Sequence, residues 1–210
     1  MSAQAAVKFP STGVDGRLVL ASSSAYRRAL LERFGLPFAW QAPDIDESPA
    51  DEESPACLVR RLALAKARAL AADFPEALII GSDQVAVIDG LPLGKPGTEA
   101  RAVAQLEACA GRTVRFLTSV CVLDLPRQHY EIEIVASDVR FRPLDRARIH
   151  NYVMRERPLD CAGSFKCEGL GIALFEAITA DDPTALIGLP LIAVAAMLAR
   201  AGLDILGDSP

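Results

Sequence analysis

Apolar and polar positions form blocks along this chain, and the first blocks predict a strand followed by a helix. The apolar segment 17–21 (RLVLA) predicts a strand that ends at a run of serines. Apolar residues then recur at helical spacing from Ala29 to Phe34, and the pattern stops at Gly35. Serine accepts backbone N–H bonds at a helix start, and glycine suits the left-handed position after the last turn. The first unit is therefore a strand, a serine-rich turn and a helix.

The same reasoning predicts the remaining elements. A second helix begins at Ser54–Pro55, where a capping serine precedes a proline at the first helical position. The apolar segment 77–80 predicts a buried strand that ends in a turn at 81–84. The later predicted elements are a hairpin of 85–88 and 91–93, a helix from Thr98 to about Cys109, antiparallel strands 115–125 and 130–141, a helix from Asp145 to about Met154, a glycine-rich loop 163–171 and a helix 187–201. This order predicts an α/β fold with a mixed central sheet flanked by helices.

Composition sets the class of protein and argues against several partners. Hydrophobic residues make up 51% of the chain and charged residues 23%, which is typical of a folded globular protein. We expect residues 1–16 to form a flexible N-terminal extension and residues 17–210 to form a single α/β domain. The net charge of −5, without an unbroken basic run, argues against a nucleic-acid polymer as a partner. The longest apolar run, 187–199, contains Pro190 and is too short to span a membrane.

Cysteine and histidine usage gives no sign of a structural metal. Five scattered cysteines lack any CxxC pair, which indicates reduced thiols in a cytoplasmic protein. The two histidines, His129 and His150, have no HExxH context, so zinc is not indicated.

Three polar features could carry chemistry. Segment 22–28 combines hydroxyls, unpaired helix-terminal N–H groups and two guanidiniums, which suits a phosphate; ordinary capping with surface arginines is the alternative. Asp83 follows the predicted buried strand, where a carboxylate can ligate a metal or accept a proton from water. The alternative for Asp83 is a turn residue that bonds its own backbone. Lys95 lies in a Gly-Lys-Pro turn that would hold its ammonium in place, and the alternative is an ordinary turn.

The ordered set of motifs resembles the Maf family. The motifs are LASSSAYRRALL, APDIDES, a lysine-bearing helix, IIGSDQV, LGKP, FLTS, AGSFKCEGLGI and IGLPL, over about residues 17 to 203. The resemblance implies a two-lobed fold with a twisted mixed sheet, similar to that of inosine-triphosphate pyrophosphatases, with the substrate in a central cleft. It also implies hydrolysis of a nucleoside triphosphate, between its α and β phosphates, to a monophosphate and pyrophosphate. The reaction would use a divalent metal (magnesium, manganese or cobalt), and a homodimer would be consistent with the family.

The resemblance further implies roles for single residues. Asp83 would accept the proton of the attacking water, with Lys66 and Lys95 as further catalytic groups. Glu47 and Asp83 would bind the metal. The side chains that would hold the triphosphate are Ser22, Arg27, Lys66 and Lys95. The chain departs from the family pattern at Ala25 (usually proline), Ala65 (often glutamate) and Ser119 (commonly glycine).

Three further positions bear on the choice of nucleotide. Tyr26, Gln84 and Glu168 resemble the branch of the family that prefers 7-methyl-GTP, so we expect them to bind substrate. Methylation at N7 leaves the guanine ring cationic, so that an aromatic ring can stack on it and a carboxylate can accept from its N1–H and amino groups.

Two alternatives remain at this point. The first is a pyrophosphatase that is directed at dTTP and UTP or is broad in its choice of base. The second is a nucleotide-binding regulator of septum formation with little turnover. The intact polar set argues against the regulator, because a pure binder could lose Asp83.

Overall fold

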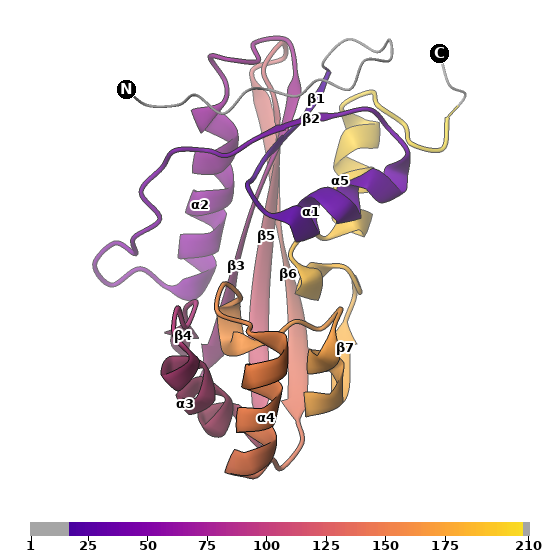
Figure 1. The fold of residues 1–210 in the computed structure, drawn as a ribbon. Helices are drawn as coiled ribbons and strands as arrows, with labels where there is room; N and C mark the ends of the chain where they lie inside the picture. The colour runs from indigo at the N-terminus through magenta and orange to yellow at the C-terminus, as the bar shows by residue number, and fades with distance from the viewer. Residues whose placement is uncertain (1–16, 208–210) are drawn as a thin grey trace, which may run out of the picture.

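The computed structural model describes residues 17–207, so the predicted N-terminal extension lies outside the described residues. A seven-stranded mixed sheet runs through the molecule in the order β2-β1-β3-β5-β6-β7, with β4 paired to β3 (Figure 1). The strands are β1 Leu18–Ala21, β2 Ala39–Gln41, β3 Leu78–Ile88, β4 Leu91–Leu93, β5 Thr113–Asp124, β6 His129–Phe141 and β7 Phe175–Ala180. Strand β1 is parallel to both of its neighbours and the other pairs are antiparallel, which confirms the predicted mixed α/β fold.

Capping side chains fix where four of the five α-helices of the described residues begin. The α-helices are α1 Ala25–Leu31, α2 Pro55–Ala69, α3 Glu99–Cys109, α4 Arg146–Glu156 and α5 Leu191–Arg200, and the short 3₁₀ helices are η1 Glu32–Phe34, η2 Ala162–Ser164, η3 Leu170–Leu174 and η4 Ala185–Ile187. The capping residues Ser24, Ser54, Thr98 and Asp145 each accept a backbone N–H from three residues further on. Within residues 17–207, no helix has both the length and the apolar character that a bilayer crossing requires.

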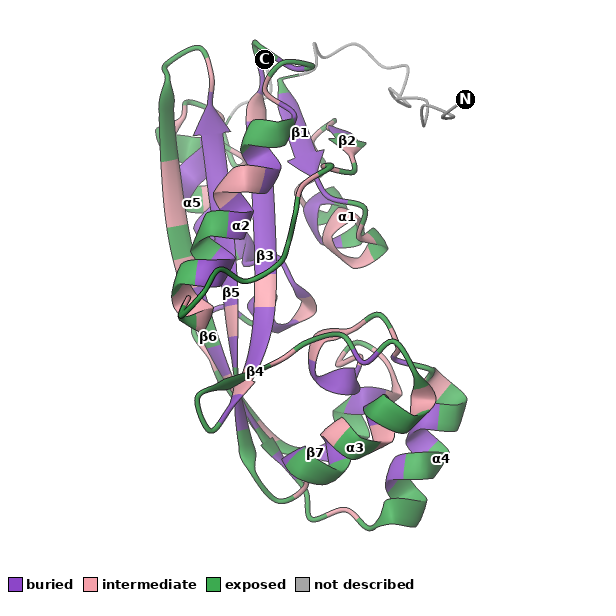
Figure 2. Cartoon of the chain, turned by 90° about the vertical axis from the view of Figure 1, so that its left-hand side faces the viewer, coloured by how far each residue is buried: buried purple, intermediate pink, exposed green. Residues whose placement is uncertain are grey.

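Strands β3, β5 and β6 extend through two lobes, and each lobe has its own core (Figures 1 and 2). In the upper lobe of Figure 1, α2 covers one face of the sheet, where Ala67 belongs to the same core as Ile79. Helices α1 and α5 cover the other face, where Val194 belongs to the same core as Ile80. The lower lobe contains β4, α3, α4 and β7, and its core includes phenylalanines in edge-to-face contact, namely Phe116, Phe141, Phe165 and Phe175.

A glycine allows α2 to lie very close to β3. A β carbon at Gly81 would lie 2.1 Å from the carbonyl oxygen of Ala63 and 2.8 Å from the backbone nitrogen of Ala67. No side chain can be accommodated at such distances unless the helix moves. The close approach matters for the site, because Lys66 lies on this part of α2.

The predicted turn at 81–84 was wrong, because β3 continues without a break from Leu78 to Ile88. Polar residues inside a strand suggest a turn, but here their side chains find partners in the folded protein. Ser82 Oγ donates to the carbonyl of Gly188, and Asp83 is paired with Lys66. Asp83 therefore lies in the middle of a long strand, where the packing passes from one lobe to the other.

The predicted helix 187–201 was wrong at its start, and two strands were missed. Gly188 adopts a φ of +125°, and Pro190 caps α5, which begins only at Leu191. Strand β2 has only three residues, and strand β7 is largely exposed, so neither shows a strong apolar pattern.

Candidate active site

The ammonium of Lys66 joins two carboxylates. Lys66 Nζ lies 2.7 Å from Asp83 Oδ1 and 2.9 Å from Glu47 Oε1. Lys66 is 5% exposed and Asp83 is 8% exposed, whereas 51% of the Glu47 side chain remains accessible. A buried ammonium needs charged partners, and the two carboxylates supply them. The three residues come from α2, β3 and the loop between β2 and α2, and they meet at one point.

Arg27 on α1 lies near enough to this point for its charge to interact with both carboxylates. Its Nε donates to the carbonyl oxygen of Gly188 at 2.8 Å. Burial lowers the pKa of Arg27, and the negative charges of Asp83 and Glu47 oppose that effect. The neighbouring guanidinium of Arg28 instead stacks over Trp40 at 4.0 Å from the ring centre, so only one of the two arginines faces the carboxylates.

The serines before α1 order the start of that helix. Ser22 is buried, and its Oγ accepts the backbone N–H of Ser24 at 3.1 Å. The Oγ of Ser24 in turn accepts the backbone N–H of Arg27 at 3.3 Å. This capping fixes the start of α1, the helix that carries Arg27, which gives the serine-rich turn a structural part in the site.

Cations surround the carboxylate of Glu47. Its partial burial acts to raise its pKa, but the hydrogen bond from Lys66 and the charges of Lys66, Lys95 and Arg27 outweigh that effect and hold the pKa below its usual value. Lys95 is exposed and follows β4 in the lower lobe, whereas the other two cations belong to the upper lobe. Positive charge from both lobes therefore converges here.

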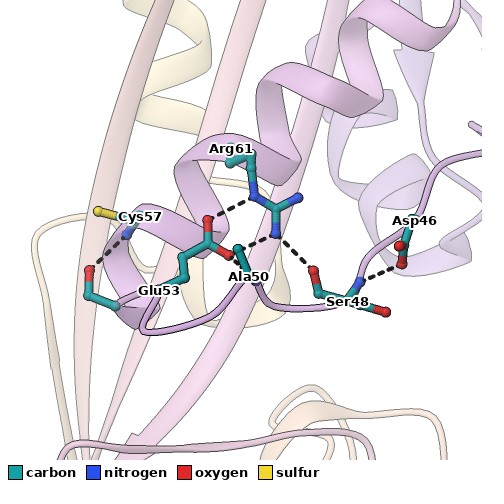
Figure 3. A network of polar contacts seen from close by, with 7 residues as sticks. Asp46, Ser48, Ala50, Glu53, Cys57 and Arg61 are labelled. Carbon is teal, nitrogen blue, oxygen red and sulfur yellow. Dashed lines mark hydrogen bonds and ion pairs between the residues drawn. The ribbon is translucent and has the colours of Figure 1, made fainter.

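An ion pair that the sequence pattern did not reveal holds the Glu47 loop against α2 (Figure 3). Arg61 on α2 makes a two-pronged contact with Glu53, from Nε to Oε1 at 2.8 Å and from Nη2 to Oε2 at 2.7 Å. The same Nη2 donates to the carbonyl of Ser48 at 2.9 Å, and Glu53 Oε2 accepts the backbone N–H of Ala50. Ser48 directly follows Glu47, so the network fixes the loop that carries this carboxylate.

The predicted base-binding residues Tyr26 and Glu168 lie on different lobes. Burial is the largest effect on the pKa of Tyr26 and raises it, while the nearby Lys166 acts in the opposite direction. Lys166 belongs to the glycine-rich loop, and its backbone N–H donates to the Tyr152 hydroxyl at 3.0 Å. Glu168, two residues further along the same loop, is exposed. Tyr26 on α1 therefore lies near the loop that carries Glu168.

Gln84 is placed differently from the other predicted substrate-binding residues. Its Nε2 donates to Thr118 Oγ1 at 2.9 Å and to the carbonyls of Ala185 and Leu186 at 3.0 and 3.1 Å. The side-chain amide thus holds η4 against β3 and β5. Its donors serve the protein in this structure, which gives Gln84 a part in shaping the site.

The donor set fits a metal that arrives together with phosphates. Among residues 17–207, no cluster of three or more histidine, cysteine, aspartate or glutamate side chains could hold a metal. Asp83 and Glu47 nevertheless contact one ammonium, which places two carboxylates at the same point. Magnesium commonly takes one or two protein carboxylates and completes its shell with substrate phosphates and water.

Residues 17–201 match the family model described as Maf-like protein. The chain belongs to the Maf family. Among its Maf relatives, a 7-methyl-GTP pyrophosphatase of Chromohalobacter salexigens is 56% identical over 91% of this chain and 99% of the relative. Relatives with the same name from a Polaromonas species and from Burkholderia lata are each 55% identical, and they cover 91% and 88% of this Maf chain and 87% and 90% of their own lengths.

This Maf chain also resembles solved structures. The Ham1 protein of Staphylococcus aureus is 13% identical, has a TM-score of 0.46, and is matched over 60% of this chain and 72% of its own.

Proposed function

We propose that this protein is a metal-dependent pyrophosphatase that cleaves 7-methyl-GTP, between its α and β phosphates, to the monophosphate and pyrophosphate. The observation that carries the proposal is the buried Lys66, which joins Asp83 and Glu47 while Arg27 and Lys95 lie around them. A pair of carboxylates inside a ring of cations suits a triphosphate with its metal. The names of relatives at 55–56% identity support the choice of reaction and substrate.

Binding follows from the charges. Arg27, Lys66 and Lys95 offer guanidinium and ammonium donors from both lobes to the phosphate oxygens. Glu47 and Asp83 would hold the divalent metal, which would neutralise charge on the triphosphate when bound. Lys66 would give up part of its contact with the two carboxylates to contact the phosphates.

Hydrolysis needs a base and a positioned water. The oxygen of water forms a bond to the attacked phosphorus, and the bond between that phosphorus and the bridging oxygen breaks. The leaving phosphate group keeps the electron pair, and Asp83 takes the proton that the water loses. Asp83 suits this part because the middle of a strand holds it rigidly and Lys66 orients its carboxylate.

Base recognition would come from Tyr26 and Glu168. The ring of Tyr26 would stack on the cationic methylguanine, and Glu168 would accept from its N1–H and amino groups. The proximity of Tyr26 to Lys166 supports this pairing, because it places α1 near the glycine-rich loop.

The direct test is release of pyrophosphate from 7-methyl-GTP, GTP, dTTP, UTP and CTP with magnesium, manganese or cobalt, beside an Asp83→Asn control. Rapid turnover of 7-methyl-GTP that falls roughly 10²- to 10⁴-fold in the control is the expected result. Faster turnover of dTTP or UTP would contradict the proposed base recognition. Nucleotide binding without turnover would contradict the proposed enzymatic activity and favour a nucleotide-binding regulator.

A further inference from the structure

Ser119 on β5 is a fully buried serine whose hydroxyl has no partner. It is 0% exposed, and within residues 17–207 its Oγ makes no hydrogen bond. Buried hydroxyls are nearly always paired, because an unpaired one destabilises the folded protein. An unpaired hydroxyl beside a candidate active site therefore calls for a functional explanation.

Strand register places Ser119 directly opposite Asp83. The two residues pair across the antiparallel strands β3 and β5. Directly opposite residues point to the same face of a sheet, with β carbons roughly 5 Å apart. This is the face covered by α2, because Gly81, two residues before Asp83, lies against the backbone of that helix. Ser119 is therefore next to the contact between Asp83 and Lys66.

The ammonium of Lys66 has three donors, and two of them serve Asp83 and Glu47 in this structure. In this structure, Asp83 Oδ1 accepts from Lys66 Nζ at 2.7 Å. When phosphate oxygens compete for that ammonium, the carboxylate loses part of its donor and becomes freer to rotate. The unpaired hydroxyl of Ser119 is the neighbouring donor that can replace it.

We propose that Ser119 is a positioning residue whose hydroxyl donates to the Asp83 carboxylate when Lys66 turns to the substrate. It keeps the carboxylate oriented toward the attacking water during the reaction. The proposal rests on the proposed pyrophosphatase function. It assigns a role to a buried hydroxyl that has no hydrogen-bond partner among the described residues.

The chain offers a matched control in Ser137 on β6. Ser137 is also 0% exposed, and its Oγ also lacks a partner within the described part of the chain. It is paired with Phe116, three residues from Ser119 along β5 and hence on the opposite face of the sheet. Its loss tests the effect of removing a buried hydroxyl away from Asp83.

The experiment compares Ser119→Ala, Ser137→Ala and the wild type by Tm and by kcat and KM for 7-methyl-GTP. Both variants should keep or raise the Tm, because each loses an unpaired buried hydroxyl. In Ser119→Ala, kcat should fall roughly tenfold to a hundredfold with KM nearly unchanged, as expected for a lost hydrogen bond to a charged group. Ser137→Ala should keep its kcat, and Ser119→Thr, which retains the hydroxyl, should regain most of the lost rate.

Several outcomes would overturn the inference. An unchanged kcat in Ser119→Ala would do so, as would an equal loss of kcat in Ser137→Ala. A folded Ser119→Thr that is as slow as Ser119→Ala would have the same meaning. A wild-type protein that releases no pyrophosphate would overturn the proposed function itself, which distinguishes that failure from a failure of the Ser119 proposal alone.

Discussion

Arg27 donates a 2.8 Å hydrogen bond from Nε to the carbonyl of Gly188, which joins α1 to the loop before α5. The bond uses one edge of the guanidinium. Arginine can donate from several sites of a planar fork, so the remaining donors are available to a phosphate. Lysine keeps the charge, but its compact ammonium lacks this planar arrangement of donors.

The first prediction follows from that geometry. Arg27→Lys should raise the KM for the triphosphate roughly tenfold or more, because charge-assisted hydrogen bonds are lost while the charge is kept. Steady-state kinetics with 7-methyl-GTP measure this change. Arg28→Lys is the matched control, since Arg28 stacks on Trp40, and its KM should stay near that of the wild type. An equal rise in KM in the two variants would contradict the proposed role of Arg27 in binding the triphosphate.

A second prediction separates the two lysines. Lys66→Met should lower the free energy of unfolding by about 3 kcal/mol, because Asp83 loses its buried partner, and should abolish most activity. Lys95→Met should leave the free energy of unfolding within about 0.5 kcal/mol, because the side chain is exposed, and should still weaken substrate binding. Urea unfolding and kinetics on both variants measure these effects. A stable Lys66→Met protein would show that the ion pair contributes little to folding.

A third prediction concerns the contact between α2 and β3. Gly81→Ala should lower the free energy of unfolding by about 1–3 kcal/mol, because the added β carbon overlaps the backbone of Ala63 and Ala67. It should also reduce kcat, since the displaced helix carries Lys66 away from Asp83. Gly94→Ala is the control for stability, because a β carbon there meets no atom of residues 17–207 within 4 Å. If the two variants unfold alike, the contact is looser than the structure indicates.

A fourth prediction concerns pH and the Glu47 loop. The hydrogen bonds from Arg61 lower the pKa of Glu53 from 4.5 to about 2. A carboxylate whose pKa is lower in the folded protein than in the unfolded chain stabilises the fold at pH values above its unfolded-state pKa. That stabilisation is lost as the pH falls toward its folded-state pKa. The Tm difference between wild type and Glu53→Gln should therefore be constant above pH 5 and narrow as the pH falls from 4.5 toward 2. A Tm difference that stays constant down to pH 2 would contradict this effect of Arg61 on the pKa of Glu53.

A fifth prediction concerns the base. Glu168→Gln should reduce the preference for 7-methyl-GTP over GTP by roughly tenfold, because the carboxylate attracts the cationic ring more strongly than an amide does. The ratio of kcat/KM for the two nucleotides measures this preference. A variant that keeps the full preference would remove Glu168 from base recognition.

Local signals in the sequence were enough for the caps of the helices. Ser24 and Ser54 each accept a hydrogen bond from the backbone N–H three positions later, so a short segment of sequence contains the whole signal. The full length of β3 could not be predicted in this way. Ser82 and Asp83 remain in a strand only because Gly188 and Lys66, which are remote in sequence, satisfy them.

The same limit applies to the candidate site. The family motifs named Lys66, Asp83 and Glu47, but their meeting at one ammonium depends on tertiary packing. The ion pair of Arg61 with Glu53 and the register of Ser119 opposite Asp83 were not predicted. Neither has a local pattern, since the first spans a loop and a helix and the second spans two strands.

Continuity of β3, β5 and β6 through both lobes limits how the enzyme can close on its substrate. Domain closure in many enzymes turns on a few loop residues that absorb large changes in φ and ψ. Here the two lobes share hydrogen-bonded strands, so any movement of one lobe relative to the other must bend the sheet. We expect the spacing between the backbone of β3 at Asp83 and the upper-lobe helices α1 and α2 to change little on binding. Adjustment to the nucleotide would then fall to the Glu47 loop and the glycine-rich loop.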